Sequence, residues 1–334
     1  MRIMYIMSNN KYLWLASLAL PFVASPGQAQ SPLSGYPSKA IKIVVPYIPG
    51  GGVDTAGRVT GQKISELTGQ PVIVENKPGA GTNIGSDFVA KAPGDGYTML
   101  LSNSSQVANA TMYGKAMPYD LLRDLAPVTM IGMTPVLLVV HPSLPVKTAR
   151  DLIALAKAKP GQLTFASAGI GSPTHIAPEL FRWMAKIDML HVPYKGGSQA
   201  VTDLIGGQIT CYFAAMSTGL PLAKSGRLRA VAVTSPQRFS AVIPEVPTVA
   251  ESGLPGYELV GWFGLMIPAS TPAEIIARAN TIAVQALRAP GMKERLLNEG
   301  TEVVANSPQE FDAFTRKELA KYEKLVKAAN IKPE

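Results

Sequence analysis

The sequence predicts an α/β protein with two lobes, and two observations support this. Short β-branched strands alternate with small-residue loops and helices over residues 41–101 and again over residues 148–233, which is typical of a parallel sheet wound with helices. The two runs are joined near residue 140 and again near residue 260, so the chain is expected to cross twice between lobes. Ligands of such sheets bind where the loops gather at the carboxyl ends of strands, so we expect a cleft between the lobes.

The first residues have the features of a secretory signal peptide. Arg2 and Lys11 carry positive charge, Leu13 to Val23 is apolar, and Gly27-Gln28-Ala29 resembles a small-x-small cleavage site. The apolar part is too short to span a bilayer comfortably, and no later stretch is long and apolar enough. We therefore expect residues 1–29 to be removed and the mature protein to be exported.

The opening strand and turn, residues 42–54, combine three local signals. Ile43–Val45 is β-branched, as in a buried strand. Gly50–Gly52 let the backbone turn sharply and leave its amides uncovered by any Cβ. Asp54 is expected to be the N-cap of the following helix. A strand, a bare-amide turn and a helix start together form an arrangement that binds anions.

The same signals define the other elements. Helices are expected at residues 54–67, 84–92, 148–159, 173–184, 198–205, 272–287 and 308–327. Strands are expected at residues 72–74, 97–101, 136–140, 163–166, 189–192, 209–213, 228–233 and 259–267. Ser172 and Pro173 fit the N-cap and N1 positions of their helix. The last two helices are expected to pack against the first sheet.

These elements divide the chain into two lobes. Residues 34–139 together with 262–334 are expected to form lobe 1, and residues 140–261 lobe 2. The segments near 136–142 and 256–262 are the predicted hinge, because only they join the lobes.

Composition and motifs exclude several functions. The formal net charge is +8, but the basic residues are scattered, so nucleic-acid binding is not expected. Thr55 and Ile84 stand where dinucleotide-binding patterns require glycine, and there is no P-loop. The histidines are not spaced as a metal set, and Cys211 is alone and expected to be buried, so no metal or cofactor is expected.

The loops favour binding over catalysis, because they contain mostly glycines, small hydroxyls and asparagine. There is no Gly-x-Ser-x-Gly elbow and no evident carboxylate pair. An exported α/β hydrolase-like enzyme using His175 and a loop serine remains the alternative. No catalytic residue is otherwise expected.

Several stretches, taken in order, resemble the Bug family, the extracytoplasmic solute receptors of tripartite tricarboxylate transporters. They are Pro-Tyr-Ile-Pro-Gly-Gly-Gly-Val-Asp (46–54), Glu-Asn-Lys-Pro-Gly-Ala-Gly (75–81), Asp-Gly-Tyr-Thr (95–98), His-Val-Pro-Tyr-Lys-Gly-Gly (191–197) and Gly-Arg-Leu-Arg-Ala-Val-Ala-Val-Thr (226–234). The resemblance implies a type II periplasmic-binding-protein fold whose lobes close on a carboxylate. It also implies a monomer in the periplasm whose partners are membrane permease subunits or a sensor protein.

The resemblance implies that the opening turn and the loop 167–174 hold the ligand, through main-chain amides and ordered waters. With the other strand-end loops, this gives the candidate ligand-binding residues. They are Tyr47, Pro49, Gly50, Gly51, Val53, Asp54, Asn83, Ser102, Ser104, Ser167, Gly169, Gly171, Ser172, Thr174, His175, Tyr194, Phe213 and Ala214.

Two departures from the family pattern make one side of this site less polar. Pro173 stands where the family often has glycine, and proline lacks an amide donor. Ala214 and Ala215 follow Phe213, where a polar residue is common. We therefore expect a ligand with a carboxylate at one end and apolar or aromatic bulk behind it.

Overall fold

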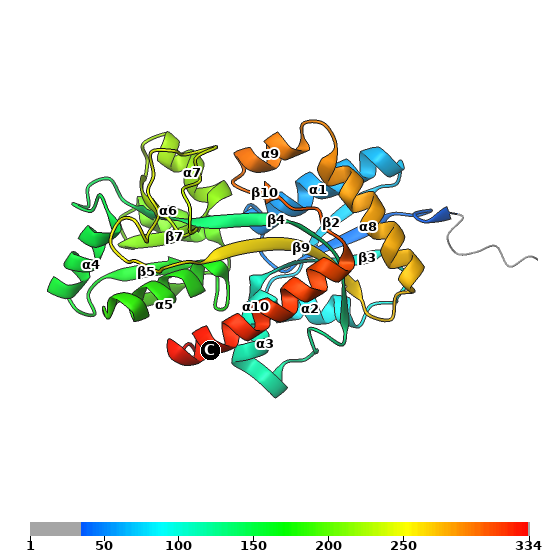
Figure 1. The fold of residues 1–334 in the computed structure, drawn as a ribbon, viewed down its shortest axis with the longest axis horizontal. Helices are drawn as coiled ribbons and strands as arrows, with labels where there is room; N and C mark the ends of the chain where they lie inside the picture. Colours follow the sequence, from blue (N-terminus) through cyan, green and yellow to red (C-terminus); the bar gives the residue numbers. More distant parts are fainter. Residues whose placement is uncertain (1–34, 333–334) are drawn as a thin grey trace, which may run out of the picture.

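The computed structural model describes residues 35–332, so the predicted signal peptide lies outside the described residues. Its two lobes lie side by side along the long axis of the molecule, each with helices packed around part of a sheet (Figure 1). The two-lobed α/β prediction is confirmed. Within residues 35–332, none of the helices has the length and apolar character needed to cross a membrane.

The strands of the described chain form one mixed sheet in the order β2-β1-β3-β9-β4-β7-β5-β6, with β10 and β8 also paired to β4. Their bounds are β1 Ile41–Val45, β2 Val72–Asn76, β3 Thr98–Asn103, β4 Leu125–Val140, β5 Thr164–Ser167, β6 Leu190–Pro193, β7 Cys211–Ala215, β8 Arg229–Val233, β9 Val260–Pro268 and β10 Glu302–Val303. Parallel pairs lie at both ends, β1 with β2 and β3, and β5 with β6 and β7. The central strands β9 and β4 are antiparallel to their neighbours.

The helices cover both faces of this sheet. Their bounds are α1 Gly52–Thr68, α2 Asn83–Ala90, α3 Ser104–Tyr113, α4 Ala149–Ala158, α5 Pro173–Ala185, α6 Gly197–Ile205, α7 Met216–Lys224, α8 Ala273–Arg288, α9 Met292–Asn298 and α10 Pro308–Ala328. Ser172 and Pro173 occupy the predicted N-cap and N1 positions of α5. The prediction for Asp54 is wrong, because α1 begins at Gly52 with Gly51 as its N-cap. Helices α3, α7 and α9 were not predicted.

Strand β4 connects the two lobes. It pairs with β9 as far as Pro135 and with β7 and β8 from Val136 onward, so one strand belongs to both halves of the sheet (Figure 1). The sequence predicted only its last part, residues 136–140. Pro127, Gly132 and Pro135 resemble strand breakers, but irregular register near the first two lets the strand continue through them.

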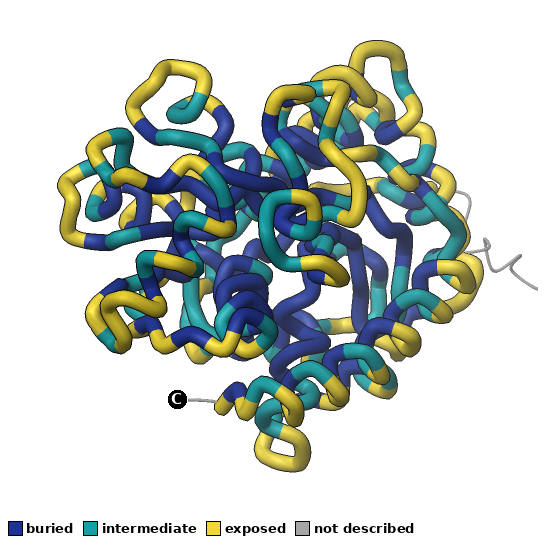
Figure 2. The backbone as a smooth tube through the Cα atoms, turned by 60° about the vertical axis from the view of Figure 1, so that its left-hand side comes forward, coloured by how far each residue is buried: buried dark blue, intermediate teal, exposed yellow. Residues whose placement is uncertain are grey.

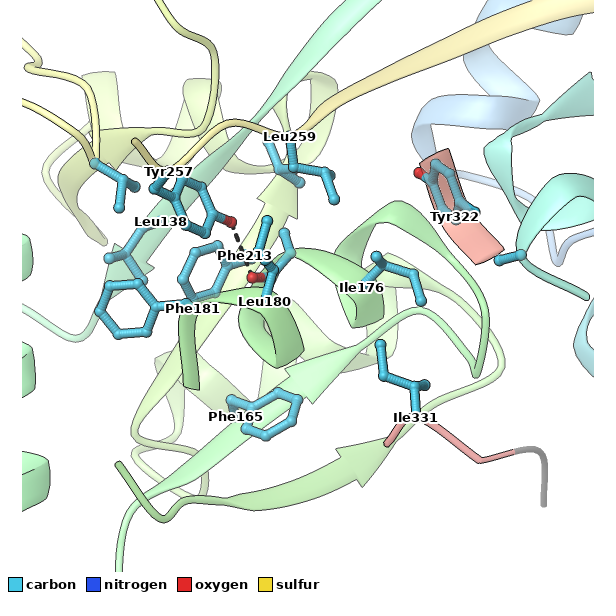
Figure 3. Close-up of a cluster of buried hydrophobic side chains, with 14 of the residues drawn as sticks. Leu138, Phe165, Ile176, Leu180, Phe181, Phe213, Tyr257, Leu259, Tyr322 and Ile331 are labelled. Carbon is cyan, nitrogen blue, oxygen red and sulfur yellow. Dashed lines mark hydrogen bonds between the residues drawn. The ribbon is translucent and has the colours of Figure 1, made fainter. Parts of the chain in front are cut away.

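The hydrophobic core is continuous between the lobes. Figure 2 shows buried backbone along the strands and inner helices, with exposed residues mainly at the loops and outer helical turns. One cluster extends from Val44 of β1 to Phe213 of β7. In it, Phe181 packs against Phe213 and Tyr257 with ring centroids 5.6 and 6.2 Å apart (Figure 3). Cys211 is buried, as predicted.

The two long C-terminal helices pack against the sheet, as predicted. Helix α8 contacts α1 and β4, and α10 contacts α3 and β4. Phe311 of α10 packs edge-on against Trp262 of β9, with ring centroids 5.4 Å apart. Gly264, on the same strand, provides the space for the Phe311 ring, since a Cβ at this position would overlap it.

A substitution at Gly264 tests this packing. Gly264→Ala forces α10 away from the sheet, so we expect the free energy of unfolding to fall by about 1–3 kcal/mol, the usual effect of overpacking. Chemical denaturation followed by circular dichroism measures this. In the control Gly206→Ala, the added methyl group meets no atom closer than 3.5 Å. Its effect should stay within about 0.5 kcal/mol. Equal effects of the two changes would contradict the packing role of Gly264.

Candidate functional site

A cavity that is partly open to solvent lies where β4 passes from one half of the sheet to the other. Lobe 1, lobe 2 and β4 all contribute to its wall. The lining residues are Tyr47, Ile48, Gly51, Gly52, Val53, Asn103, Thr134, Pro135, Val136, Ala168, Ser172, Pro173, Thr174, Gly196, Gly197, Tyr212, Ala215, Thr218 and Phe263.

Within residues 35–332, five helices begin at this cavity. Their N-cap residues, Gly51 of α1, Asn103 of α3, Ser172 of α5, Gly196 of α6 and Ala215 of α7, all line it. The first turn of a helix has amide N–H groups without intrahelical acceptors, and the helix dipole adds positive potential there. The cavity is therefore surrounded by the ends of helices that favour an anion.

The Asp54 carboxylate holds the opening turn through hydrogen bonds. One carboxylate oxygen of Asp54 accepts hydrogen bonds from the Gly50 amide (3.0 Å) and from Nε of Arg58 (2.9 Å). The other accepts from Nδ2 of Asn76 (2.9 Å). Burial acts to raise the pKa of Asp54, but these hydrogen bonds outweigh it and hold the pKa below its usual value. The Gly50 amide is therefore bonded to Asp54 and is not free for a ligand, and the Asp54 charge lies outside the cavity lining.

The amides of the next residues, Gly52 and Val53, remain free to donate to a ligand. In the described chain, the N–H groups of Gly52 and Val53 make no hydrogen bond, because they belong to the first turn of α1. Gly52 also lies against α7 of the other lobe, since a Cβ on it would be 2.8 Å from Oγ of Ser217. A residue with a side chain at this position would push the lobes apart.

A capping box fixes the aromatic wall of the cavity. The Asn103 side chain accepts from the Ser105 amide (2.9 Å), and Gln106 accepts from the Asn103 amide (2.8 Å). The Asn103 Nδ2 group also donates to the Tyr47 hydroxyl (3.2 Å), which contacts Oγ of Ser105 at 2.5 Å. Asn103 pairs with Phe263 across β3 and β9. The polar groups of this wall are therefore occupied, and its rings face the cavity.

The loop 167–174 is held by hydrogen bonds among its own hydroxyls. Ser172 Oγ donates to the Gly169 carbonyl (2.6 Å), and Thr174 Oγ1 accepts from the Ala168 amide (2.8 Å). The two hydroxyl oxygens lie 2.8 Å apart. Because the Ser172 proton goes to Gly169, Thr174 must donate to Ser172. This loop is thus rigid before any ligand arrives.

The cavity has no charged wall. Among residues 35–332, no Asp, Glu, Lys, Arg or His lines it. An anion bound here would be neutralised only by amides, hydroxyls and helix dipoles. Nor does the described part of the chain contain a cluster of three or more His, Cys, Asp or Glu side chains that could hold a metal ion.

The structure brings some of the candidate residues to the cavity and leaves others elsewhere. Those that line it are Tyr47, Gly51, Val53, Ser172 and Thr174. Those outside the lining are Pro49, Gly50, Asp54, Asn83, Ser102, Ser104, Ser167, Gly169, Gly171, His175, Tyr194, Phe213 and Ala214.

Three of the polar candidates outside the lining form hydrogen bonds within the protein instead of facing the cavity. Ser102 donates to the Gly264 carbonyl (3.1 Å), Asn83 accepts from Asn109 (3.1 Å), and the Tyr194 hydroxyl donates to Asp203 (2.6 Å). Ser104, Phe213 and Ala214 are fully buried.

His175 lies behind the cavity wall. Its Nδ1 accepts from the Gly171 amide (3.2 Å), and its ring stacks on His191 at 4.3 Å. Burial, together with the neighbouring His191 and Arg182, lowers the pKa of His175 to about 3. Oγ of Ser167 lies 2.7 Å from Nε2 of His191, but Ser167 is fully buried. The hydrolase-like alternative is therefore not supported.

Several lining residues were not among the candidate ligand-binding residues, although Gly52, Pro173 and Ala215 had already been noted in the sequence as features of the site. The lining residues not selected are Ile48, Gly52, Asn103, Thr134, Pro135, Val136, Ala168, Pro173, Gly196, Gly197, Tyr212, Ala215, Thr218 and Phe263. Gly196 and Gly197 could have been predicted as site residues, because they lie between a strand and a helix start as Gly50–Gly52 do. The part of β4 at Thr134–Val136 carried no such signal.

A substitution at Asp54 tests the support of the opening turn. Asp54→Ala leaves Arg58 and Asn76 without their acceptor, so we expect the free energy of unfolding to fall by about 2 kcal/mol at neutral pH. Because the folded pKa is lowered, the stabilisation is complete above the ordinary value of 3.8 and is lost as pH falls through the lower folded value. The difference between variant and wild type should therefore shrink in acid.

Thermal unfolding over a pH series measures this difference. The control is Asp312→Ala, which removes an exposed (i, i+4) pair with Arg316 and should cost less than about 0.5 kcal/mol. A stability difference for Asp54→Ala that does not change with pH would contradict the role of the carboxylate.

Comparison with known proteins identifies the family. The model of the tripartite tricarboxylate transporter family receptor matches residues 56–331. BugT of Bordetella pertussis is 37% identical over 314 residues, which are 93% of this chain and 96% of that protein. The solved structure of Rpa4515 from R. palustris with adipate has a TM-score of 0.86 and 34% identity, covering 90% of this chain and all of that one.

MatC (Rpa3494) from Rhodopseudomonas palustris, solved with bound malate, has a TM-score of 0.82 and 28% identity over 87% of this chain and 99% of that one. These similarities extend over nearly the whole described chain and agree with the Bug-type resemblance of its motifs. The protein belongs to the family of tripartite tricarboxylate transporter receptors.

Proposed function

We propose that the protein is a solute receptor that captures an organic acid in the cavity, with one carboxylate at the amides that begin α1. The observation that carries this proposal is the meeting of five helix N-termini around a cavity that no charged side chain of residues 35–332 lines. Such a site stabilises a carboxylate through backbone donors, and its described lining holds no carboxylate, imidazole or amine that could act as a general base.

The receptor acts outside the cytoplasm in this proposal. The predicted signal peptide of residues 1–29 supports export, and BugD, a related solved structure, is described as a periplasmic binding protein. The captured acid would pass to membrane permease subunits of a tripartite transporter. Delivery to a sensor protein is the other partner that the family resemblance allows.

The acid is proposed to have an apolar body. Apolar side chains from both lobes and from β4 line the cavity, namely Ile48, Phe263, Pro173, Pro135 and Val136. These side chains give no hydrogen bond to replace the water around a polar ligand, so they favour hydrocarbon or an aromatic ring. The adipate and malate complexes of the related proteins show that receptors of this family hold small dicarboxylic acids.

Binding is proposed to close the lobes about β4 and β9. The lobe boundaries, residues 34–139 with 262–334 and residues 140–261, remain a prediction, as does the hinge. Glycines stand where the lobes meet around the cavity: a Cβ on Gly196 would overlap Ile48, and one on Gly81 would lie 3.2 Å from the Ile170 carbonyl oxygen. The lobes can approach this closely only because these side chains are absent.

A panel of acids tests the proposed ligand class. Isothermal titration with citrate, glutamate, adipate, nicotinate and terephthalate should show the tightest binding for an acid with an apolar body. The physical reason is that citrate and glutamate place polar groups against apolar walls. Tight binding of citrate alone would contradict the apolar body. Consumption of an acid, followed by chromatography of the mixture, would support an enzyme instead.

Gly196→Ala tests closure. The added methyl group overlaps Ile48 of the other lobe, so the variant should bind the tightest acid of the panel at least about tenfold more weakly. Its X-ray scattering profile should also compact less on ligand addition. The double variant with Ile48→Ala should recover part of the affinity. Gly206→Ala, which does not line the cavity, is the control. A Gly196→Ala variant that binds and compacts normally would show that closure does not bring Gly196 against Ile48.

A further inference from the structure

Tyr212 lines the cavity and carries a buried hydroxyl that residues 35–332 of the protein do not use. It lies on β7 of lobe 2, its ring is fully buried, and it lines the cavity. Within the part of the chain that the structure describes, its Oη has no hydrogen-bond partner. A buried hydroxyl without a partner is uncommon and destabilising, so it calls for an explanation.

The surroundings of this hydroxyl leave its proton free. Gly197, at the start of α6, approaches so closely that a Cβ there would lie 3.0 Å from Oη of Tyr212. Thr174 is the neighbouring hydroxyl and acts on the pKa of Tyr212, but their contact does not meet the geometry of a hydrogen bond. Thr174 cannot donate to Tyr212 either, because its proton goes to Ser172, whose own proton goes to Gly169.

The protonation of Tyr212 supports this role. Burial raises the pKa of the hydroxyl well above its ordinary value, while the neighbouring Thr174 acts to lower it. The group therefore stays protonated at neutral pH, and no ionisation competes with hydrogen bonding to a ligand.

The position of Tyr212 complements the opening turn. The free amides of Gly52 and Val53 belong to lobe 1, and Tyr212 with Gly197 belongs to β7 and α6 of lobe 2. All four residues line the same cavity. A solute held by a carboxylate at α1 would therefore present its other end to a hydroxyl donor and a second helix N-terminus.

We propose that Tyr212 determines specificity by donating a hydrogen bond to a second acceptor oxygen at the far end of the solute, which makes dicarboxylic acids with an apolar spacer the preferred class. This inference rests on the proposed function. The hydroxyl is kept unpaired in the empty protein so that a solute with an acceptor can satisfy it, and a solute without one leaves it unsatisfied.

The experiment compares matched acids in wild type and Tyr212→Phe. The pairs are adipate with hexanoate and terephthalate with benzoate, where each second acid lacks one carboxylate. We expect wild type to prefer the dicarboxylate of at least one pair. In Tyr212→Phe, affinity for that dicarboxylate should fall by about tenfold, and affinity for its monocarboxylate should change by less than about twofold.

Stability provides the second readout. Because the hydroxyl has no protein partner, Tyr212→Phe should unfold at the same denaturant concentration as wild type or a higher one. Tyr322→Phe is the matched control, since the Tyr322 hydroxyl is also buried and unpaired in the described chain but does not line the cavity. This control should leave all four affinities unchanged.

Four outcomes of the titrations would overturn the inference. Equal losses for both members of a pair would show that the ring only packs, and an unchanged dicarboxylate affinity would show that the hydroxyl is not used. Binding of monocarboxylates but not dicarboxylates by wild type would refute the far-end acceptor and leave the proposed function standing. Failure of wild type to bind these acids or any of the five panel acids would refute both.

Discussion

The cavity depends on one constraint, which is that the amide groups at the helix N-termini around it need hydrogen-bond acceptors. Each helix begins with amide groups that need an acceptor from outside the helix. At α3 the protein supplies one, because Asn103 caps its own helix, and Asp54 plays a related part below α1 by holding the Gly50 amide. At Gly52 and Val53 no group of the described chain does so. These amides point to a ligand carboxylate as the missing acceptor.

The absence of charged groups from the lining has a physical consequence. A buried Lys or Arg would bind a carboxylate strongly, but it would also need a counter-ion whenever the cavity is empty. Backbone dipoles are fixed by the fold and carry no net charge, so the empty site remains stable. Arg58, the nearest cation on α1, is instead paired with Asp54 outside the cavity. A site of this kind suits a receptor that must bind and later release its solute.

Local sequence signals predicted the frame of the site well. Strand, small-residue loop and helix start were visible at residues 43–54, and Ser172 with Pro173 marked the beginning of α5 correctly. Asp54 was misplaced because an acidic residue in the first turn resembles an N-cap, while the true cap, Gly51, has no side chain to reveal it. Ser102 and Ser104 were selected, although strand geometry brings the intervening Asn103 to the cavity instead.

The remaining site depends on contacts between distant segments, which local patterns do not encode. Thr134–Val136 line the cavity only because β4 runs through Pro127 and Pro135 from one half of the sheet to the other. Tyr212 is followed by the predicted Phe213, yet alternation along β7 sends the two side chains to opposite faces of the sheet, and only Tyr212 lines the cavity.

The central claim is that backbone amides at the start of α1 hold a carboxylate. A crystal structure of the protein with the tightest-binding acid of the panel tests this most directly. The account predicts carboxylate oxygens within about 3.2 Å of the amide nitrogens of Gly52 and Val53, directly or through one ordered water. An acid held instead by Lys or Arg side chains outside the cavity, with these amides facing only solvent, would contradict it.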